Sequence, residues 1–99
     1  MKDINIIVYT MNGCPHCIEF KKMLKENNIE FFDRDIDEYE EEYDTFSEIT
    51  GSDYIPALLI IEGNENDYQS FLYTPDKDYN ELTEAVEIIN RHRKNVGII

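Results

Sequence analysis

The chain has 99 residues, of which 41% are hydrophobic, and it carries a formal net charge of −13 at pH 7. Its length predicts one domain over residues 1–99, and its hydrophobic content argues against disorder. The negative charge excludes nucleic acid as a partner, because phosphate backbones recruit lysine and arginine. No apolar run reaches the roughly 18 residues of a membrane span, so we expect no membrane partner.

Short apolar and amphipathic segments alternate from the start of the chain. Residues 4–9 are β-branched and almost continuously apolar, which predicts a strand buried on both faces. Residues 10–13 follow as a loop, and Pro15 suits the first position of a helix, where its missing N–H costs nothing. The inner face of this helix carries residues at three- and four-residue spacing: Cys17, Phe20 and Leu24. The helix is expected to end near Asn27.

The middle of the chain is acidic. Residues 29–36 predict a second strand, and the helix after it has one apolar stripe: Tyr39, Tyr43, Phe46 and Ile49. Gly51 is well placed to end this helix, because glycine readily adopts a left-handed C-cap conformation. Acidic residues concentrate between positions 33 and 53, where only Arg34 opposes them. They form either a solvated face that keeps the protein soluble or a docking surface for a basic partner.

A hairpin follows the acidic helix. Residues 57–61 predict another buried strand, residues 63–66 supply turn chemistry, and residues 68–73 form the partner strand. Asp78 and Glu81 have the spacing of a capping box and predict the start of the last helix.

The last helix completes the fold. Its buried face is expected to carry three apolar residues: Leu82, Val86 and Ile89. We expect it to fray after Asn95 and to leave residues 96–99 as a short tail. The predicted order is β-α-β-α-β-β-α, which indicates an α/β fold with a four-stranded mixed sheet and helices on both faces.

Two cysteines, Cys14 and Cys17, stand two residues apart. The first residues lack the apolar stretch of a signal peptide, so we expect a cytoplasmic location, where paired cysteines serve metal or redox chemistry. A closed zinc site needs four ligands, and His16 and His92 are poorly placed to complete one. We therefore expect no metal ligand, although an iron–sulfur cluster shared between subunits stays open as an alternative.

The helix start explains how these cysteines could react. With Cys14 at the N-cap, backbone N–H groups of the first turn point toward its sulfur, and these donors and the helix dipole stabilise a thiolate. Cys14 is thus the predicted nucleophile, and Cys17, one turn further on the apolar face, is the predicted resolving thiol. His16 either favours the thiolate further or is a tolerated residue at an exposed helix start.

A proline stands directly before the third predicted strand. A cis bond at Ile55-Pro56 would place the Ile55 backbone beside Cys14, where it could dock an extended substrate. On local sequence alone the cis form is uncommon, at about 6% of such bonds.

These features resemble the glutaredoxins of the thioredoxin superfamily. Residues 8–17 are similar to the family's strand and active-site segment, and residues 54–56 are similar to its Thr-Val-Pro element, in which the proline is cis. The element order matches over roughly residues 4–95. The resemblance implies a thiol–disulfide oxidoreductase in which Cys14 attacks and Cys17 resolves. It also implies a set of substrate-binding residues: Pro15, His16, Ile55 and Pro56.

Three departures concern glutathione. Met11 stands where glutaredoxins usually carry a lysine or arginine, Tyr54 replaces the usual threonine, and the family's Gly-Gly and acidic motif is not recognisable around residues 73–76. We therefore expect weak use of glutathione as a candidate co-substrate. The expected protein is a monomer without a tightly bound cofactor that reduces protein disulfides or mixed disulfides with glutathione.

Other readings of the sequence stay open. One is an electron donor, for example to ribonucleotide reductase, that receives electrons from a thioredoxin reductase-type enzyme and not from glutathione. The others are an iron–sulfur-binding module of the glutaredoxin type and a redox-inert adaptor that uses its acidic helix.

Overall fold

The structure is a computed structural model that describes residues 3–64 and 66–98, so Met1, Lys2, Glu65 and Ile99 lie outside the described residues. Its elements follow the predicted order: β1 (Asp3–Thr10), α1 (Pro15–Glu26), β2 (Phe32–Asp35), α2 (Glu40–Thr50), β3 (Ala57–Asn64), β4 (Asp67–Tyr73) and α3 (Leu82–Asn95). The predicted α/β class is confirmed.

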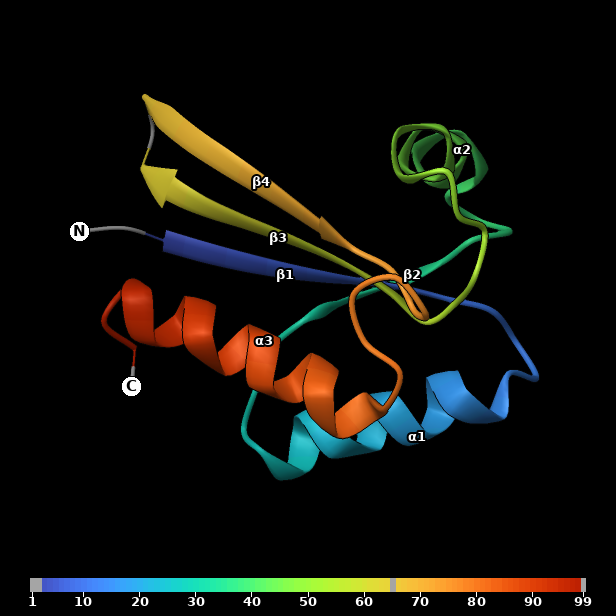
Figure 1. The fold of residues 1–99 in the computed structure, drawn as a ribbon, viewed down its shortest axis with the longest axis horizontal. Helices are drawn as coiled ribbons and strands as arrows, with labels where there is room; N and C mark the ends of the chain where they lie inside the picture. The colour runs from blue at the N-terminus through green and yellow to red at the C-terminus, as the bar shows by residue number, and fades with distance from the viewer. Residues whose placement is uncertain (1–2, 65, 99) are drawn as a thin grey trace.

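The four strands form one mixed sheet in the order β2-β1-β3-β4. Strand β1 pairs in parallel with β2 and antiparallel with β3, which in turn pairs antiparallel with β4. Helices α1 and α3 cover one face of the sheet, and α2 lies across one end of the other face (Figure 1). The carboxyl end of β1 therefore leads into α1 at the same end of the sheet where β3 begins.

Strand β1 separates two hydrophobic cores. Ile6 and Val8 face the larger core under α1 and α3, whereas Ile7 and Tyr9 face the smaller core under α2. Successive side chains of a strand point to opposite faces, so burial on both faces produces the continuous apolar run seen in the sequence.

The second strand is shorter than predicted because its expected first residues belong to the end of α1. Asn28 adopts φ +57°, and the Ile29 N–H donates to the Leu24 carbonyl at 2.9 Å. This is a Schellman cap, in which a left-handed residue lets the chain satisfy the last helical carbonyls. Ile29 is buried in the larger core as part of that cap, not as a strand residue.

The predicted apolar stripe of α2 is correct for Tyr43 and Phe46, which are buried, and wrong for Ile49, which is 69% exposed. Helix α2 covers only one end of its face of the sheet (Figure 1). Ile49 consequently lines a surface groove together with Phe46 and Leu72. Gly51 ends the helix at φ +70°, as expected.

Both ends of α3 differ from the prediction. The capping box consists of Glu81 and Glu84, because the Asp78 carboxylate instead accepts the Thr74 N–H at 2.8 Å and holds the preceding loop. At the other end, Gly97 adopts φ +83° and the Ile98 N–H donates to the Arg93 carbonyl at 2.9 Å. Residues 96–98 thus form a cap and not a frayed tail.

Candidate active site

The first turn of α1 holds both cysteines. Cys14 is the N-cap, with φ −91° and ψ 107°, and Pro15 takes the first helical position. Gly13, at φ +77°, makes the turn that leads the chain into the cap, a conformation that favours glycine. The Cys17 N–H donates to Cys14 Sγ at 3.2 Å. One of the free donors of the helix start therefore points at this sulfur.

The two thiols lie in different environments. Cys14 is partly exposed, whereas Cys17 is 0% exposed, and both are free thiols in this structure. Burial, and next to it the contact with Cys14, raises the pKa of the Cys17 thiol to about 12. Cys17 is therefore protonated at neutral pH.

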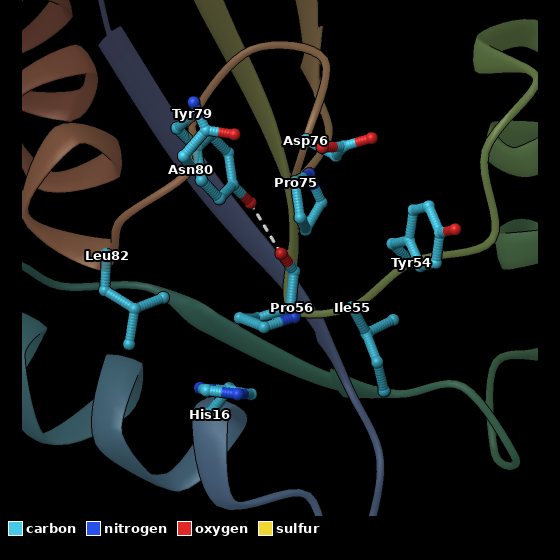
Figure 2. A pocket seen from close by; sticks show the side chains of 9 residues that line it. All are labelled: His16, Tyr54, Ile55, Pro56, Pro75, Asp76, Tyr79, Asn80 and Leu82. Carbon is cyan, nitrogen blue, oxygen red and sulfur yellow. Dashed lines mark hydrogen bonds between the residues drawn. The ribbon is translucent and has the colours of Figure 1, made fainter.

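The loop before β3 lies beside this turn. The Ile55-Pro56 peptide bond is cis, the form that the resemblance implies. Pro56 is buried, while the preceding Tyr54 is exposed. The Tyr79 hydroxyl donates to the Pro56 carbonyl at 2.5 Å, so the loop before α3 contacts the proline loop directly (Figure 2).

These segments enclose a groove of about 440 Å³ (Figure 2). Its lining residues come from α1, the proline loop and the segment from β4 into α3: His16, Tyr54, Ile55, Pro56, Pro75, Asp76, Tyr79, Asn80 and Leu82. Three of the four predicted substrate-binding residues are thus brought together. The fourth, Pro15, is exposed and does not line the groove.

The groove carries little positive charge. His16 and Asp76 line it, and within the described part of the chain no lysine or arginine does. Lys77 follows Asp76 in the sequence, but its ammonium donates to the Thr50 carbonyl. Met11, where the resemblance calls for a cation, is 42% exposed and uncharged.

The loop between β4 and α3 forms one side of the groove, yet it has no sequence motif that marks a site. Asp76 adopts φ +75°, an uncommon conformation for a residue other than glycine. Tyr79 is 3% exposed, an unusual burial for a loop residue. A single aromatic residue within the polar stretch 74–81 is the one signal that could have indicated its importance.

A cysteine pair at a helix start, with its second thiol buried and a proline loop beside it, defines a thiol oxidoreductase of thioredoxin fold. The solved thioredoxins of Trichomonas vaginalis and Plasmodium falciparum share this fold with TM-scores of 0.58 and 0.55, at 14% and 12% identity. The alignments cover 94% and 96% of this chain and 78% and 72% of the respective thioredoxins.

Sequence comparison identifies the family within the thiol oxidoreductases to which the chain belongs. The glutaredoxin family model matches residues 6–64. The N-acetyl-S-hydroxy-L-cysteine reductase of Bacillus subtilis (strain 168) is 32% identical over 62 residues, which are 63% of this chain and 67% of that protein. The chain belongs to the glutaredoxin family and is a thiol oxidoreductase.

The family match covers only part of the groove. Cys14, Cys17 and Pro56 lie within residues 6–64, whereas the β4–α3 loop lies beyond them.

In residues 3–64 and 66–98, no group of three or more histidine, cysteine or acidic side chains is arranged to hold a metal ion. No helix in the same part of the chain is long and apolar enough to cross a membrane.

Proposed function

We propose that this protein reduces protein disulfides through a dithiol–disulfide cycle of Cys14 and Cys17. One observation carries the proposal: Cys14 Sγ accepts a backbone hydrogen bond at the start of α1 while Cys17 is fully buried behind it. A sulfur that accepts backbone N–H bonds at a helix N-terminus is stabilised as the thiolate, which is the nucleophilic form.

The cycle transfers two electrons to the substrate. Cys14 thiolate attacks one sulfur of the substrate disulfide, the substrate S–S bond breaks, and the other sulfur leaves as a thiolate that takes up a proton. Cys17 then attacks Cys14 Sγ, and its proton passes to the substrate sulfur that leaves. The mixed disulfide breaks, the second substrate thiol is released, and Cys14 and Cys17 are left joined as a disulfide.

The burial of Cys17 gives the two steps their order. Its thiol pKa of about 12 keeps it protonated at neutral pH, so it does not compete with Cys14 for the incoming disulfide. Cys17 attacks only after the mixed disulfide has formed, because that disulfide supplies both the sulfur to be attacked and the leaving sulfur that takes up the Cys17 proton.

The groove supports a polypeptide substrate. The Ile55 and Pro56 backbone offers an edge along which an extended chain could pair, as in other modes of peptide recognition. Glutathione is a net anion, and among the described residues no lysine or arginine lines the groove to pair with its carboxylates. We therefore propose weak use of glutathione and a thioredoxin reductase-type enzyme as the reductant that restores the dithiol.

The Bacillus relative favours a second candidate. Its name states that it reduces N-acetyl-S-hydroxy-L-cysteine. With such a substrate, Cys14 would attack the S-hydroxylated sulfur and the oxygen would leave as water after taking up protons. Cys17 would then resolve the mixed disulfide and release the thiol.

Cysteine variants test the cycle. Insulin reduction should fall to background in Cys14→Ser, and Cys17→Ser should accumulate a mixed disulfide that mass spectrometry detects. Full activity of Cys14→Ser would overturn the mechanism. Parallel assays with glutathione and its reductase, and with a thioredoxin reductase without added thioredoxin, identify the reductant, and efficient turnover with glutathione would contradict weak glutathione use.

An absorption spectrum distinguishes a dithiol–disulfide enzyme from an iron–sulfur module. We propose a cytoplasmic monomer without a tightly bound cofactor. Protein purified without oxygen should then show no visible absorption, whereas an iron–sulfur module shared between subunits would absorb visible light and reduce insulin poorly.

A further inference from the structure

Tyr79 connects the β4–α3 loop to the proline loop. Its ring lies in the larger core and its hydroxyl donates to the Pro56 carbonyl at 2.5 Å (Figure 2). Pro56 is buried, and Ala57, which follows it, is the first residue of β3 and pairs with Tyr9. The Tyr79 bond thus fixes the peptide unit at the junction between the Ile55–Pro56 backbone and the sheet.

The loop around Tyr79 is itself braced. The Asp76 N–H donates to the Tyr79 carbonyl at 2.7 Å, and the Asp78 carboxylate accepts the Thr74 N–H at 2.8 Å. The backbones of Pro75 and Tyr79 also pair as an isolated parallel β-bridge. These bonds hold the Tyr79 backbone while the core holds its ring, so its hydroxyl has a fixed position.

The hydroxyl also keeps its proton. Burial first, and then the charges of Asp78 and Cys17, raises the pKa of Tyr79 above its ordinary value. The phenol therefore remains a hydrogen-bond donor throughout the pH range in which thiols exchange. The influence of Cys17 also places Tyr79 in the electrostatic surroundings of the cysteine pair.

We infer that Tyr79 is a positioning residue that holds the Ile55–Pro56 backbone in place for extended polypeptide disulfides. The inference rests on the proposed disulfide reduction and adds a residue that acts only through the docking backbone. A small disulfide without a peptide backbone does not use that edge. Loss of the Tyr79 hydroxyl should therefore affect the two kinds of substrate differently.

The test compares two disulfides and two variants. Reduced protein is mixed with a peptide disulfide or with hydroxyethyl disulfide, and its oxidation is followed by quenching, alkylation and mass spectrometry. In Tyr79→Phe the ratio of the peptide rate constant to the hydroxyethyl rate constant should fall about five-fold, as for one lost hydrogen bond. The fall should appear as a higher half-saturating peptide concentration with a similar limiting rate.

Tyr73→Phe is the matched control. It also removes a phenol hydrogen bond to the interior, because Tyr73 Oη lies 2.6 Å from His92 Nε2, but Tyr73 does not line the groove. For Tyr73→Phe, the ratio of the peptide rate constant to the hydroxyethyl disulfide rate constant should equal that of the wild type. An unchanged ratio in Tyr79→Phe, or an equal fall in both variants, would overturn the inference while leaving disulfide reduction intact. A wild-type protein that reduces neither disulfide would overturn the proposed function.

A second measurement needs no variant at Tyr79. In Cys17→Ser protein trapped with the peptide, amide hydrogen exchange of Ile55 should slow relative to protein trapped with hydroxyethyl disulfide. Equal exchange in the two trapped forms would show that the peptide does not dock on this backbone, and the inference would then be wrong.

Discussion

Cys14 and Cys17 share one motif but differ in burial, and this difference separates their chemistry. Cys14 meets solvent at the N-cap, while Cys17 faces the interior from the same turn. The helix start makes the distinction, because Cys14 is the N-cap with extended backbone angles, whereas Cys17 is helical and lies on the buried face. The proposed order, in which Cys14 attacks and Cys17 resolves, rests on that difference in burial.

The Cys17 thiol should titrate only in strongly alkaline solution. In Cys14→Ser protein, its ¹³Cβ chemical shift should stay at the thiol value well above pH 8.5, because burial, the first cause that raises its pKa to about 12 when Cys14 is present, remains. A raised pKa means that the folded state holds the proton more tightly than the unfolded state. The stability that Cys17 contributes is thus fully present below about pH 8.5, the ordinary thiol pKa, and is lost as the pH rises through 12. Titration near pH 8.5 would contradict this prediction.

Asp76 should determine the charge preference of the groove. Asp76→Asn keeps the shape of the side chain and tolerates φ +75°, so it changes mainly the charge. Its rate with glutathione disulfide should rise about two- to five-fold at low salt, the size expected for one exposed charge, and the gain should shrink at high salt. Asp44→Asn on α2 is the control with the same charge change. An equal gain in the control would assign the effect to net charge.

The sequence indicated Cys14, Cys17 and Pro56 because each stands in a short local pattern. Tyr79 and Asp76 have no such pattern. The Tyr79 bond to Pro56 spans 23 residues, and only the completed fold brings these segments together. Tertiary contacts of this kind leave no periodic signal in a single sequence.

At the scale of elements, the identity and order of helices and strands followed from periodicity, whereas several boundaries did not. The error at β2 arose because Ile29 is apolar and follows directly on the α1 cap, so it looks like the start of a strand. The error at α3 arose because two acidic pairs have the spacing of a capping box, Asp78 with Glu81 and Glu81 with Glu84. Only the hydrogen bonds distinguish them.

The α3 cap gives a stability prediction. The Glu84 carboxylate accepts the Glu81 N–H at 3.0 Å, so Glu84→Ala should lower the free energy of unfolding by roughly 1 kcal/mol. Glu87→Ala, on the exposed surface of the same helix, should change it by less than about 0.5 kcal/mol. Urea unfolding measures both. Equal losses would mean that helix charge, and not the cap, accounts for the effect.

Across the whole molecule, a polar network joins α3 to the sheet inside the larger core. His92 Nδ1 lies 2.9 Å from Glu62 Oε2, and His92 Nε2 lies 2.6 Å from the Tyr73 hydroxyl. Both His92 and Glu62 are buried. With the proton on Nδ1, the ring donates to the carboxylate and accepts from the phenol, so every member of the network has a partner.

Removing one side chain of this network should lower the stability of the protein. His92→Leu leaves the Glu62 carboxylate buried without its partner and should lower the free energy of unfolding by roughly 3 kcal/mol. The double variant Glu62→Leu with His92→Leu should recover most of that loss, because no buried charge remains. Urea unfolding of the single and double variants tests the coupling, and additive losses would contradict it.

The groove beside the cysteine turn is assembled from two parts of the chain that the Tyr79–Pro56 hydrogen bond joins. The reacting thiols and the proline loop lie within the stretch that matches the family, while the opposite side is a short loop closed by its own hydrogen bonds. On the proposed function, mutations in residues 74–78, which leave the Tyr79 bond in place, should change which disulfides are accepted without altering the cysteine pair. An engineer could therefore graft a new substrate preference onto this loop while keeping the cysteine motif and the Tyr79 bond.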